Sequence, residues 1–267
     1  MQPFRDRVVI ITGASEGIGR ALALALAAQS PKLVLAARNA QRLQSLADEC
    51  GSAGADALVI PTDVSEEGGC RDLIAATVAR HGRIDVLINN AGATMWARFD
   101  ALATADVFER LLRVNFLSAV WCTWHALPHL RATRGQLVGV ASIAGLTGVP
   151  ERSAYAASKH ALVGFFESLR IELTTTGVSV TIVAPDFVVS EIHRRALGAD
   201  GAPLGVSPMQ EGKIMSAEEC ARLMVQGIAR RERLLITSRR GRLGRWMKLI
   251  APAFVDRLAA AAIAKRR

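Results

Sequence analysis

The sequence predicts an α/β protein built around one doubly wound, parallel sheet of seven strands. Short runs rich in Val, Ile and Leu alternate along the chain with Ala/Leu-rich stretches of helical length. Continuous apolar strands separated by helices are typical of a parallel sheet whose two faces are covered by helices. The length of 267 residues, 51% of them hydrophobic, suits a single domain with a full core.

Each strand is expected where an apolar run lies between turn residues, and each helix where the helical period follows. The expected strands are Val8–Thr12, Leu33–Ala37, Ala57–Pro61, Asp85–Asn89, Gln136–Ser142, Val178–Ala184 and Leu234–Thr237. The expected helices are Gly19–Gln29, Asn39–Cys50, 66–80, 104–131, 153–175 and 217–230. The last of them opens with the capping box Ser216-Ala217-Glu218-Glu219.

One stretch interrupts this alternation. Residues 186–215 contain several glycines and prolines and show little periodicity. In sheets of this kind, ligands bind beyond the carboxyl ends of the strands. A long irregular segment after the sixth strand is therefore expected to be a substrate lid, with an ordinary surface loop as the alternative.

A glycine-rich loop, Thr12-Gly13-Ala14-Ser15-Glu16-Gly17-Ile18-Gly19, follows the first expected strand and opens a helix. Glycines allow a tight turn and a close approach to a pyrophosphate, and a helix N-terminus offers unpaired N–H groups. The loop therefore predicts a dinucleotide site, and an ordinary glycine turn is the alternative.

The only tyrosine, Tyr155, precedes Lys159 by four residues, and Ser142 ends the fifth expected strand. Residues four apart share a helix face, so the lysine ammonium can approach the phenol. A nearby cation stabilises phenolate, and a serine hydroxyl can hold a substrate oxygen beside it. These three groups suit proton exchange at a carbonyl oxygen.

The spacing Gly-x-x-x-Gly-x-Gly is similar to that of the classical short-chain dehydrogenases/reductases, and the likeness covers about residues 7–240. It includes Asp63-Val64, Asn89-Asn90-Ala91-Gly92, Asn115, Ser142 and Tyr155-x-x-x-Lys159. The resemblance implies a Rossmann-type catalytic domain over residues 1–240. It also implies an NAD(P)-dependent enzyme that interconverts a carbonyl and an alcohol.

The resemblance assigns a role to each motif. Asn115, Ser142, Tyr155 and Lys159 would be the catalytic residues, with Ser142 and Tyr155 also binding the substrate oxygen. Asn115 would bend its helix and hold a water that links Lys159 to solvent. The cofactor would be bound by Gly13, Ser15, Gly17, Ile18, Gly19, Arg38, Asp63, Val64, Asn90, Ala91, Gly92, Tyr155, Lys159, Pro185, Val188 and Ser190.

The residues after the second strand favour NADP, with NAD as the alternative. A carboxylate there would bind the ribose 2′-hydroxyl of NAD, but this chain has Ala37 followed by Arg38. Arginine forms charge-assisted contacts with phosphate, and Ser15 can add a hydroxyl. Glu16 argues the other way, because the NADP-preferring members of the family often carry a basic residue there.

The chain departs from the family after the sixth strand, where Asp186 replaces the usual glycine and Ser190 the usual threonine. Glycine accepts backbone angles that strain aspartate. We therefore expect Asp186 either to adopt a strained left-handed conformation or to line the substrate pocket. Activity should survive, with a changed substrate preference.

The basic charge is concentrated at the C-terminus. Residues 239–267 hold nine Lys/Arg and one Asp, so this segment carries +8 of the net charge of +9. The nearly neutral body does not indicate nucleic-acid binding. Residues 241–267 combine these cations with apolar side chains and predict an amphipathic segment in peripheral contact with an anionic membrane. An arm on a partner subunit or over the substrate pocket is the alternative.

The remaining expectations concern substrate, partners and location. The substrate is expected to be a hydrophobic carbonyl or alcohol, and the family implies a homodimer or homotetramer built through the helices near 104–131 and 153–175. Four widely spaced cysteines, no secretory signal and no membrane span favour a cytoplasmic protein without a metal site. A related epimerase or dehydratase and a non-enzymatic NADP-binding sensor or scaffold are the alternative functions.

Overall fold

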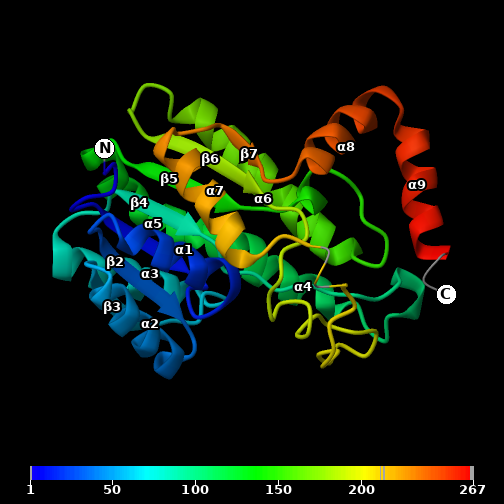
Figure 1. Cartoon of the computed structure of the whole chain (residues 1–267), viewed down its shortest axis with the longest axis horizontal. Helices are drawn as coiled ribbons and strands as arrows, with labels where there is room; N and C mark the ends of the chain where they lie inside the picture. The colour runs from blue at the N-terminus through cyan, green and yellow to red at the C-terminus, as the bar shows by residue number, and fades with distance from the viewer. Residues whose placement is uncertain (1, 211, 213, 265–267) are drawn as a thin grey trace.

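The computed structural model describes residues 2–210, 212 and 214–264, and it contains one seven-stranded sheet (Figure 1). The strand order is β3-β2-β1-β4-β5-β6-β7, and all neighbouring pairs are parallel. The order reverses direction between β1 and β4, which creates the crevice in which doubly wound folds bind ligands. The predicted Rossmann-type fold is thus confirmed.

The strands lie close to where the apolar runs predicted them. They are β1 (Val8–Thr12), β2 (Lys32–Ala37), β3 (Asp56–Pro61), β4 (Val86–Asn89), β5 (Gln136–Val140), β6 (Ser179–Ala184) and β7 (Leu234–Ile236). Most of their residues are buried on both faces, as a parallel sheet between two helix layers requires.

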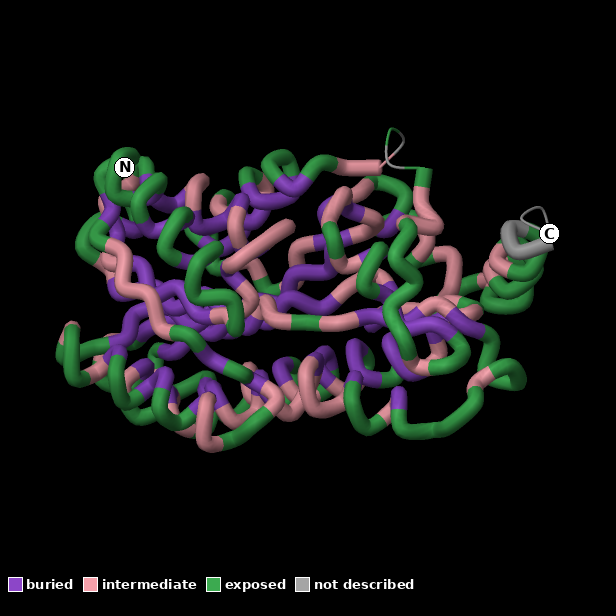
Figure 2. Tube along the Cα trace, turned by 90° about the horizontal axis from the view of Figure 1, so that it is seen from below, coloured by how far each residue is buried: buried purple, intermediate pink, exposed green. Residues whose placement is uncertain are grey.

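Helices cover both faces of the sheet. On one face, α1 (Gly17–Ala27), α2 (Ala40–Ser52) and α7 (Ala217–Ala229) pack in one hydrophobic cluster with Val9 and Ile11 of β1. On the other, α3 (Glu67–His81), α5 (Ser118–Thr133) and α6 (Ser153–Glu172) pack in a second cluster with Val8 and Ile10. Figure 2 shows the buried residues gathered in the central layer. Successive side chains of β1 point to opposite faces of the sheet, so this strand contributes to both clusters.

The helix expected over 104–131 contains a wider turn at Asn115, the residue at which the resemblance implied a bend. The chain forms α4 (Asp106–Leu112), a π-helical turn η2 (Arg113–Leu117) and then α5. The Oδ1 atom of Asn115, within the turn, accepts a hydrogen bond from the Ala93 backbone N–H at 2.7 Å. Contacts of this kind with another segment accompany the widened turn, and helical periodicity alone does not predict them.

The chain between β6 and α7 is irregular in its described part. Its pairing consists of isolated bridges that join Val188 to Met215, Met95 to Leu197 and Leu197 to Pro203. Residues 211 and 213 of the segment expected as a lid lie outside the described residues.

After β7 the chain forms α8 (Arg239–Ile250) and α9 (Pro252–Ala264), which extend beside the sheet rather than over it (Figure 1). Among the described side chains of these helices, the large apolar ones that are exposed are Leu243, Trp246, Leu249, Ile250, Phe254 and Leu258. Lys265, Arg266 and Arg267 of the basic segment lie outside the described residues. Within the described chain, each helix is too short or too polar to cross a membrane.

Candidate active site

A cavity of about 1350 Å³ lies at the carboxyl ends of the strands. The segments after β1, β2, β4, β5 and β6 all contribute to its walls, and α8 and α9 add Gly244, Arg245, Val255, Leu258 and Ala259. All of the residues predicted to bind cofactor or substrate line this cavity. Asn115 is the one predicted site residue that is absent from its lining.

The glycine loop is closely packed against the segment after β4. Gly13 has a φ of +66°, and a Cβ atom there would lie 2.8 Å from the Ala91 Cα. A Cβ on Gly19 would lie 2.3 Å from the Gly13 carbonyl oxygen. Neither position can accept a side chain without moving backbone. Steric crowding therefore requires glycine at both positions. The N-terminus of α1 is left open to the cavity.

Asn90 joins the end of β4 to the end of β1. Its side-chain Nδ2 donates to the carbonyl oxygens of Thr12 at 2.9 Å and Gly13 at 3.2 Å. The hydroxyl of Thr12 in turn accepts hydrogen bonds from the backbone N–H groups of Asn90 and Ala91, each at 3.0 Å. These contacts hold the floor of the cavity between the two central strands.

Charged groups surround the cavity near the end of β2. Burial alone would raise the pKa of Asp63, but hydrogen bonds from Ser65 and the nearby Arg38 cation bring it below its ordinary value. Glu16 accepts hydrogen bonds from Arg42 at 2.6 Å and from Arg195 at 2.8 Å. The carboxylate that argued against NADP is therefore paired with two guanidinium groups.

Asn115 lies behind the cavity and is 2% exposed. Besides the bond from Ala93, its Nδ2 donates to the Ala93 carbonyl at 2.9 Å and to the Ser158 hydroxyl at 2.8 Å. A Cβ on Gly92 would meet both the Asn115 Oδ1 at 3.2 Å and the Lys159 Nζ at 3.5 Å. Asn115 and Lys159 therefore adjoin the same backbone position.

Lys159 is 3% exposed and lies beside Tyr155 on α6. Its Nζ donates to the Val140 carbonyl at 2.8 Å and is 5.9 Å from the centroid of the Tyr155 ring. Burial, and secondly the Arg152 cation, lower the pKa of Lys159 to about 7. The Lys159 amino group can therefore gain and lose a proton near neutral pH.

Ser142 follows β5, and Tyr155 of α6 lines the same cavity. Its hydroxyl accepts a hydrogen bond from the Ala144 backbone N–H at 3.2 Å and lies 3.5 Å from the Pro185 carbonyl. Both Ser142 and Tyr155 line the cavity. Tyr155 is 7% exposed, so only a small part of its side chain is open to the cavity.

Asp186 does not adopt the strained conformation, since it is not among the non-glycine residues with positive φ in the described chain. It lines the cavity, which was the other expectation. Its carboxylate also accepts hydrogen bonds from the Ser238 hydroxyl at 2.8 Å and from Arg240 Nη2 at 2.9 Å. Asp186, which stands where the family usually has glycine, thus forms an ion pair with Arg240 at the start of α8.

Arg152 is a residue of the site that was not among the predicted ones. The guanidinium carbon of this residue lies 4.3 Å from the centroid of the Tyr155 ring, and the residue is 5% exposed. Burial lowers the pKa of Arg152, and the neighbouring Tyr155 opposes that shift. Its position three residues before Tyr155 was the available signal, because residues three apart share a helix face.

Comparisons with known proteins agree with this architecture. The family model of short chain dehydrogenases matches residues 7–199. The 11-beta-hydroxysteroid dehydrogenase-like 4A of Arabidopsis thaliana is 39% identical over 247 residues, covering 92% of this chain and 81% of that protein. A short-chain dehydrogenase/reductase from Burkholderia phymatum in complex with NAD shares the fold, with a TM-score of 0.82, 24% identity and coverage of 95% and 96% of the two chains.

A further solved structure is the alcohol dehydrogenase from Thermococcus sibiricus, which is complexed with 5-hydroxy-NADP. It has a TM-score of 0.74 and 25% identity, and the match covers 86% of this chain and 95% of that one. The chain belongs to the short-chain dehydrogenase/reductase family. It is an NAD(P)-dependent oxidoreductase that acts on CH–OH groups. The Burkholderia structure is a complex with NAD, and the Thermococcus structure is a complex with 5-hydroxy-NADP.

Proposed function

We propose that this enzyme interconverts a hydrophobic ketone or aldehyde and its alcohol with NADP(H), and that Tyr155 is the acid and base. The observation that carries the proposal is the placement of Tyr155 and Ser142 in one cavity with the glycine loop, next to the buried Lys159. The loop geometry fits a dinucleotide, because glycine at positions 13 and 19 allows the close backbone packing that leaves the N-terminus of α1 facing the cavity.

In the proposed reduction, the hydroxyls of Ser142 and Tyr155 donate hydrogen bonds to the substrate carbonyl oxygen. Such donors stabilise the charge that develops on oxygen as the carbonyl is reduced. Tyr155 then transfers its proton to that oxygen, and in the oxidation direction it takes the proton back. The bound nicotinamide supplies or accepts the hydride.

Lys159 and Asn115 assist Tyr155 in this proposal. A protonated Lys159 stabilises the phenolate left after proton transfer, and a pKa of about 7 lets it exchange protons at neutral pH. The Asn115 side chain is hydrogen-bonded to the Ala93 backbone and to the Ser158 hydroxyl. It would position the lysine and a water that connects it to solvent.

Arg38 supports the preference for NADP. It lines the cavity immediately after β2, where Ala37 provides no carboxylate for a ribose 2′-hydroxyl. The pairing of Glu16 with Arg42 and Arg195 reduces its repulsion of a 2′-phosphate. The contacts to the remaining predicted cofactor residues are part of the same proposal.

The hydrophobic character of the substrate is supported by the walls of the cavity. Leu146, Val149 and Leu197 line it from the body, and Val255 and Leu258 line it from α9. Described residues of the irregular segment, including Phe187 and Ile192, form another wall, which supports its proposed role as a lid. Two relatives have names that refer to hydroxysteroid dehydrogenases, and steroids are apolar substrates of this kind.

The test is a nicotinamide absorbance screen over apolar ketones, aldehydes and alcohols with NADPH, NADH and their oxidised forms, comparing the wild type with Ser142→Ala. We expect turnover by the wild type and a loss on the order of 10²-fold in Ser142→Ala, as for the removal of one oxyanion donor. Equal turnover by the two proteins would refute the proposed site.

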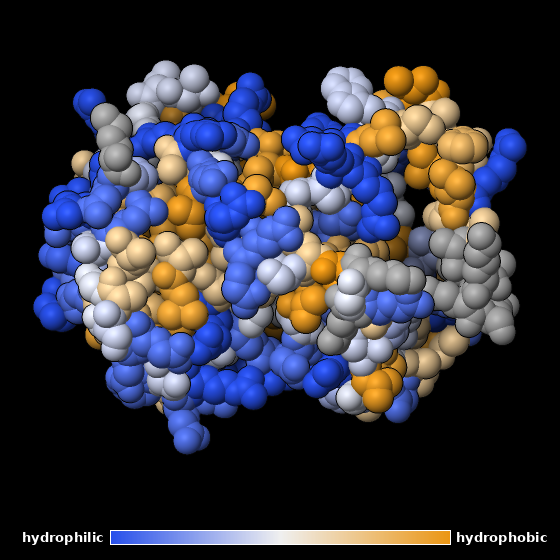
Figure 3. All heavy atoms as spheres, viewed as in Figure 1, coloured by the Kyte–Doolittle hydropathy of each residue, from blue (hydrophilic) through white to orange (hydrophobic). Residues whose placement is uncertain are grey.

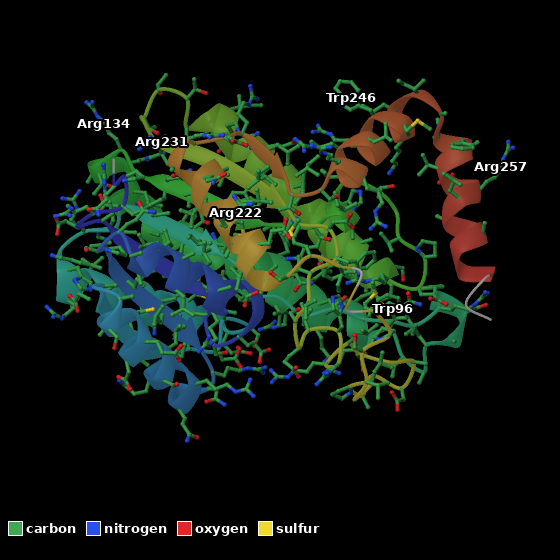
Figure 4. All side chains as sticks on the ribbon, in the orientation of Figure 1. Trp96, Arg134, Arg222, Arg231, Trp246 and Arg257 are labelled. Atoms are coloured by element: carbon green, nitrogen blue, oxygen red, sulfur yellow. The ribbon has the colours of Figure 1, made fainter. Side chains whose placement is uncertain are left out.

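We also propose that the enzyme is cytoplasmic and makes peripheral contact with a membrane, which the exposed apolar residues of α8 and α9 support. They alternate with cations, and Figure 3 shows apolar and hydrophilic atoms side by side along these helices. In Figure 4, Trp246 and Arg257 point away from the body of the molecule. Apolar groups beside cations suit the boundary between headgroups and acyl chains in an anionic leaflet.

Two exposed side chains support a homodimer or homotetramer through the predicted helices. Trp124 of α5 and Ile171 of α6 are each 74% exposed. Large apolar side chains of this kind are common at subunit interfaces. Light scattering should give a multiple of 28.5 kDa for the wild type, and Trp124→Asp should shift the mass toward the monomer. A monomeric wild type would contradict the assembly.

A further inference from the structure

Arg152 places a positive charge inside the reactive end of the cavity. It lies at the N-terminal boundary of α6, one turn before Tyr155, and it lines the cavity. Three aromatic rings lie around its guanidinium carbon: Tyr155 at 4.3 Å, Trp96 at 5.2 Å and Phe187 at 5.9 Å. Figure 4 shows Trp96 on the side of the body that faces α9. The rings shield this cation from water.

The structure gives this cation little compensation from polar groups. Its Nη2 donates to the Thr94 hydroxyl, and a hydrogen bond with the Tyr155 side chain opposes the lowering of its pKa by burial. Its Nε is buried without a hydrogen-bond partner. Among the ion pairs of the described residues, none includes Arg152. Cation–π contacts offset part of the cost of burying a charge, and a carboxylate would offset more.

The acidic side chains that line the same cavity are engaged elsewhere. Glu151 accepts a hydrogen bond from the Trp96 indole at 3.1 Å. Asp186 is bound by Arg240, and Glu16 is bound by Arg42 and Arg195. Asp63 and Glu66, which also line the cavity, are bonded to Ser65 and Arg113. Since no carboxylate of the described residues forms an ion pair with Arg152, a ligand is left as the source of an anion for it, besides Tyr155 itself.

A second buried cation lies on the other side of Tyr155. Lys159 is 5.9 Å from the ring centroid, and Arg152 contributes to lowering its pKa. Two cations that disfavour each other create a positive potential in a closed pocket. A negatively charged ligand group would relieve that repulsion for both.

We propose that Arg152 binds a carboxylate of the substrate, so that the enzyme acts on an oxo acid or hydroxy acid with an apolar remainder. This inference depends on the proposed function, since it specifies the substrate of the same site. Arg152 contacts the ring whose hydroxyl would hold the reacting oxygen. The carboxylate would therefore lie only a few bonds from the carbonyl. A guanidinium is suited to bind it through two parallel hydrogen bonds.

Substrates that differ in charge alone test this inference. The probes are phenylglyoxylate and 3-benzoylpropionate, each beside its methyl ester, with wild type, Arg152→Lys and Arg152→Met. The wild type should favour each acid over its ester by at least about tenfold in kcat/KM. Arg152→Met should lose on the order of 10²-fold on the acids but only a few-fold on the esters, as expected when a charge-assisted pair is removed. Arg152→Lys should lie between them.

Two outcomes would overturn the inference. Equal losses on acids and esters in Arg152→Met would mean that Arg152 acts through Tyr155 rather than on the substrate. A wild type that prefers the esters would remove the need for a carboxylate. The esters also report separately on the proposed function, because their Tyr155-dependent reduction does not require Arg152.

A binding measurement covers the case in which a variant fails to fold or a probe is not turned over. Phenylglyoxylate should raise the melting temperature of the wild type more than its methyl ester does, with cofactor present in both samples. Arg152→Lys should reduce that difference. The same shift with acid and ester in the wild type would sink the carboxylate site whatever the activity of the protein.

Discussion

Arg240 forms a two-pronged ion pair with Asp186, its Nη2 lying 2.9 Å from one carboxylate oxygen and 3.0 Å from the other. The Ser238 hydroxyl, which caps α8 by accepting from Gly241 N–H at 2.8 Å, donates to the same carboxylate. The residue that replaces the family's glycine thus connects the segment after β6 to the start of α8.

Breaking this contact should loosen the C-terminal helices without unfolding the body. Asp186→Asn removes the charge that Arg240 binds, and because Arg240 is 74% exposed we expect a cost of only about 1 kcal/mol. Amide hydrogen exchange should become faster in α8 and α9 while the sheet is unchanged. Arg242→Ala, an exposed residue of the same helix, is the control and should leave the exchange as it was.

Arg38→Ala should shift cofactor preference from NADP toward NAD. The variant loses a charge-assisted contact to the 2′-phosphate, which NAD lacks, so we expect the Kd for NADPH to rise on the order of tenfold to a hundredfold. The Kd for NADH should change by no more than a few-fold. Arg71→Ala, an exposed arginine on α3, is the matched control. Equal effects on both nucleotides would refute the assignment of Arg38.

Burial of Lys159 makes part of the stability depend on pH. Burial, together with the Arg152 cation, lowers the folded-state pKa to about 7, whereas the ordinary value is 10.5. Between these values the unfolded chain binds a proton that the folded chain does not, so stability rises with pH across this window. Below the folded pKa the full penalty is present.

Lys159→Met removes this titration. Its free energy of unfolding relative to the wild type should therefore be higher at pH 7 than at pH 9, by up to about 2 kcal/mol. Urea unfolding of the cofactor-free proteins measures it. A difference that does not change with pH would show that the lysine is not buried as a neutral amine.

Asp85 should be important for stability rather than catalysis. It is 1% exposed, and it accepts hydrogen bonds from Arg83, Arg7 and the Val8 backbone N–H. Burial alone would raise its pKa, but these bonds bring it below the ordinary value. Its contribution is present above the unfolded-state pKa of about 3.9 and is lost as pH falls through the folded value.

Asp85→Asn should cost on the order of 1–2 kcal/mol at pH 7, because the buried Val8 N–H and two half-exposed guanidinium groups lose a charged acceptor. The difference from the wild type should shrink in acid. Asp72→Asn, which changes an exposed ion pair, should cost under about 0.5 kcal/mol. Thermal or urea unfolding gives both values, and a cost for Asp85→Asn as small as that of the control would contradict the assignment.

The C-terminal apolar residues should be required for lipid binding. The triple variant Trp246→Ser, Leu249→Ser, Ile250→Ser removes exposed side chains of α8 and should float with anionic liposomes much less than the wild type. A protein of residues 1–238 should not float. Phe99→Ser, which changes an exposed residue of the body, is the control. If wild type and 1–238 float equally, the membrane proposal fails.

Much of the fold could be predicted because the strands are short apolar runs between turn residues. Val8–Thr12 was placed without error, and the other strands differ by one or two residues at their ends. The resemblance, and not the helical period, implied a bend at Asn115. The π-helical turn found there makes contacts with Ala93 and Ser158, which lie far away in the sequence. Periodicity carries no information about such contacts.

The residues of the cofactor loop and the Tyr155 motif were predictable because they are close together in sequence. The position of Arg152 near Tyr155 was a signal, and an arm over the pocket was an alternative for the C-terminal segment, but the contacts of Arg152 and α9 depend on packing in three dimensions. The surroundings of Arg152 come from Trp96 and Phe187 on separate segments. The cavity walls supplied by Val255 and Leu258 exist only because α9 folds back beside the body.

The most direct test of the proposed mechanism is the turnover of Tyr155→Phe beside its affinity for NADPH. Phenylalanine keeps the ring and removes the hydroxyl, so kcat should fall by on the order of 10²–10⁴-fold, while the Kd for NADPH and the melting temperature stay close to the wild-type values. Turnover within a few-fold of the wild type would show that Tyr155 is not the acid and base.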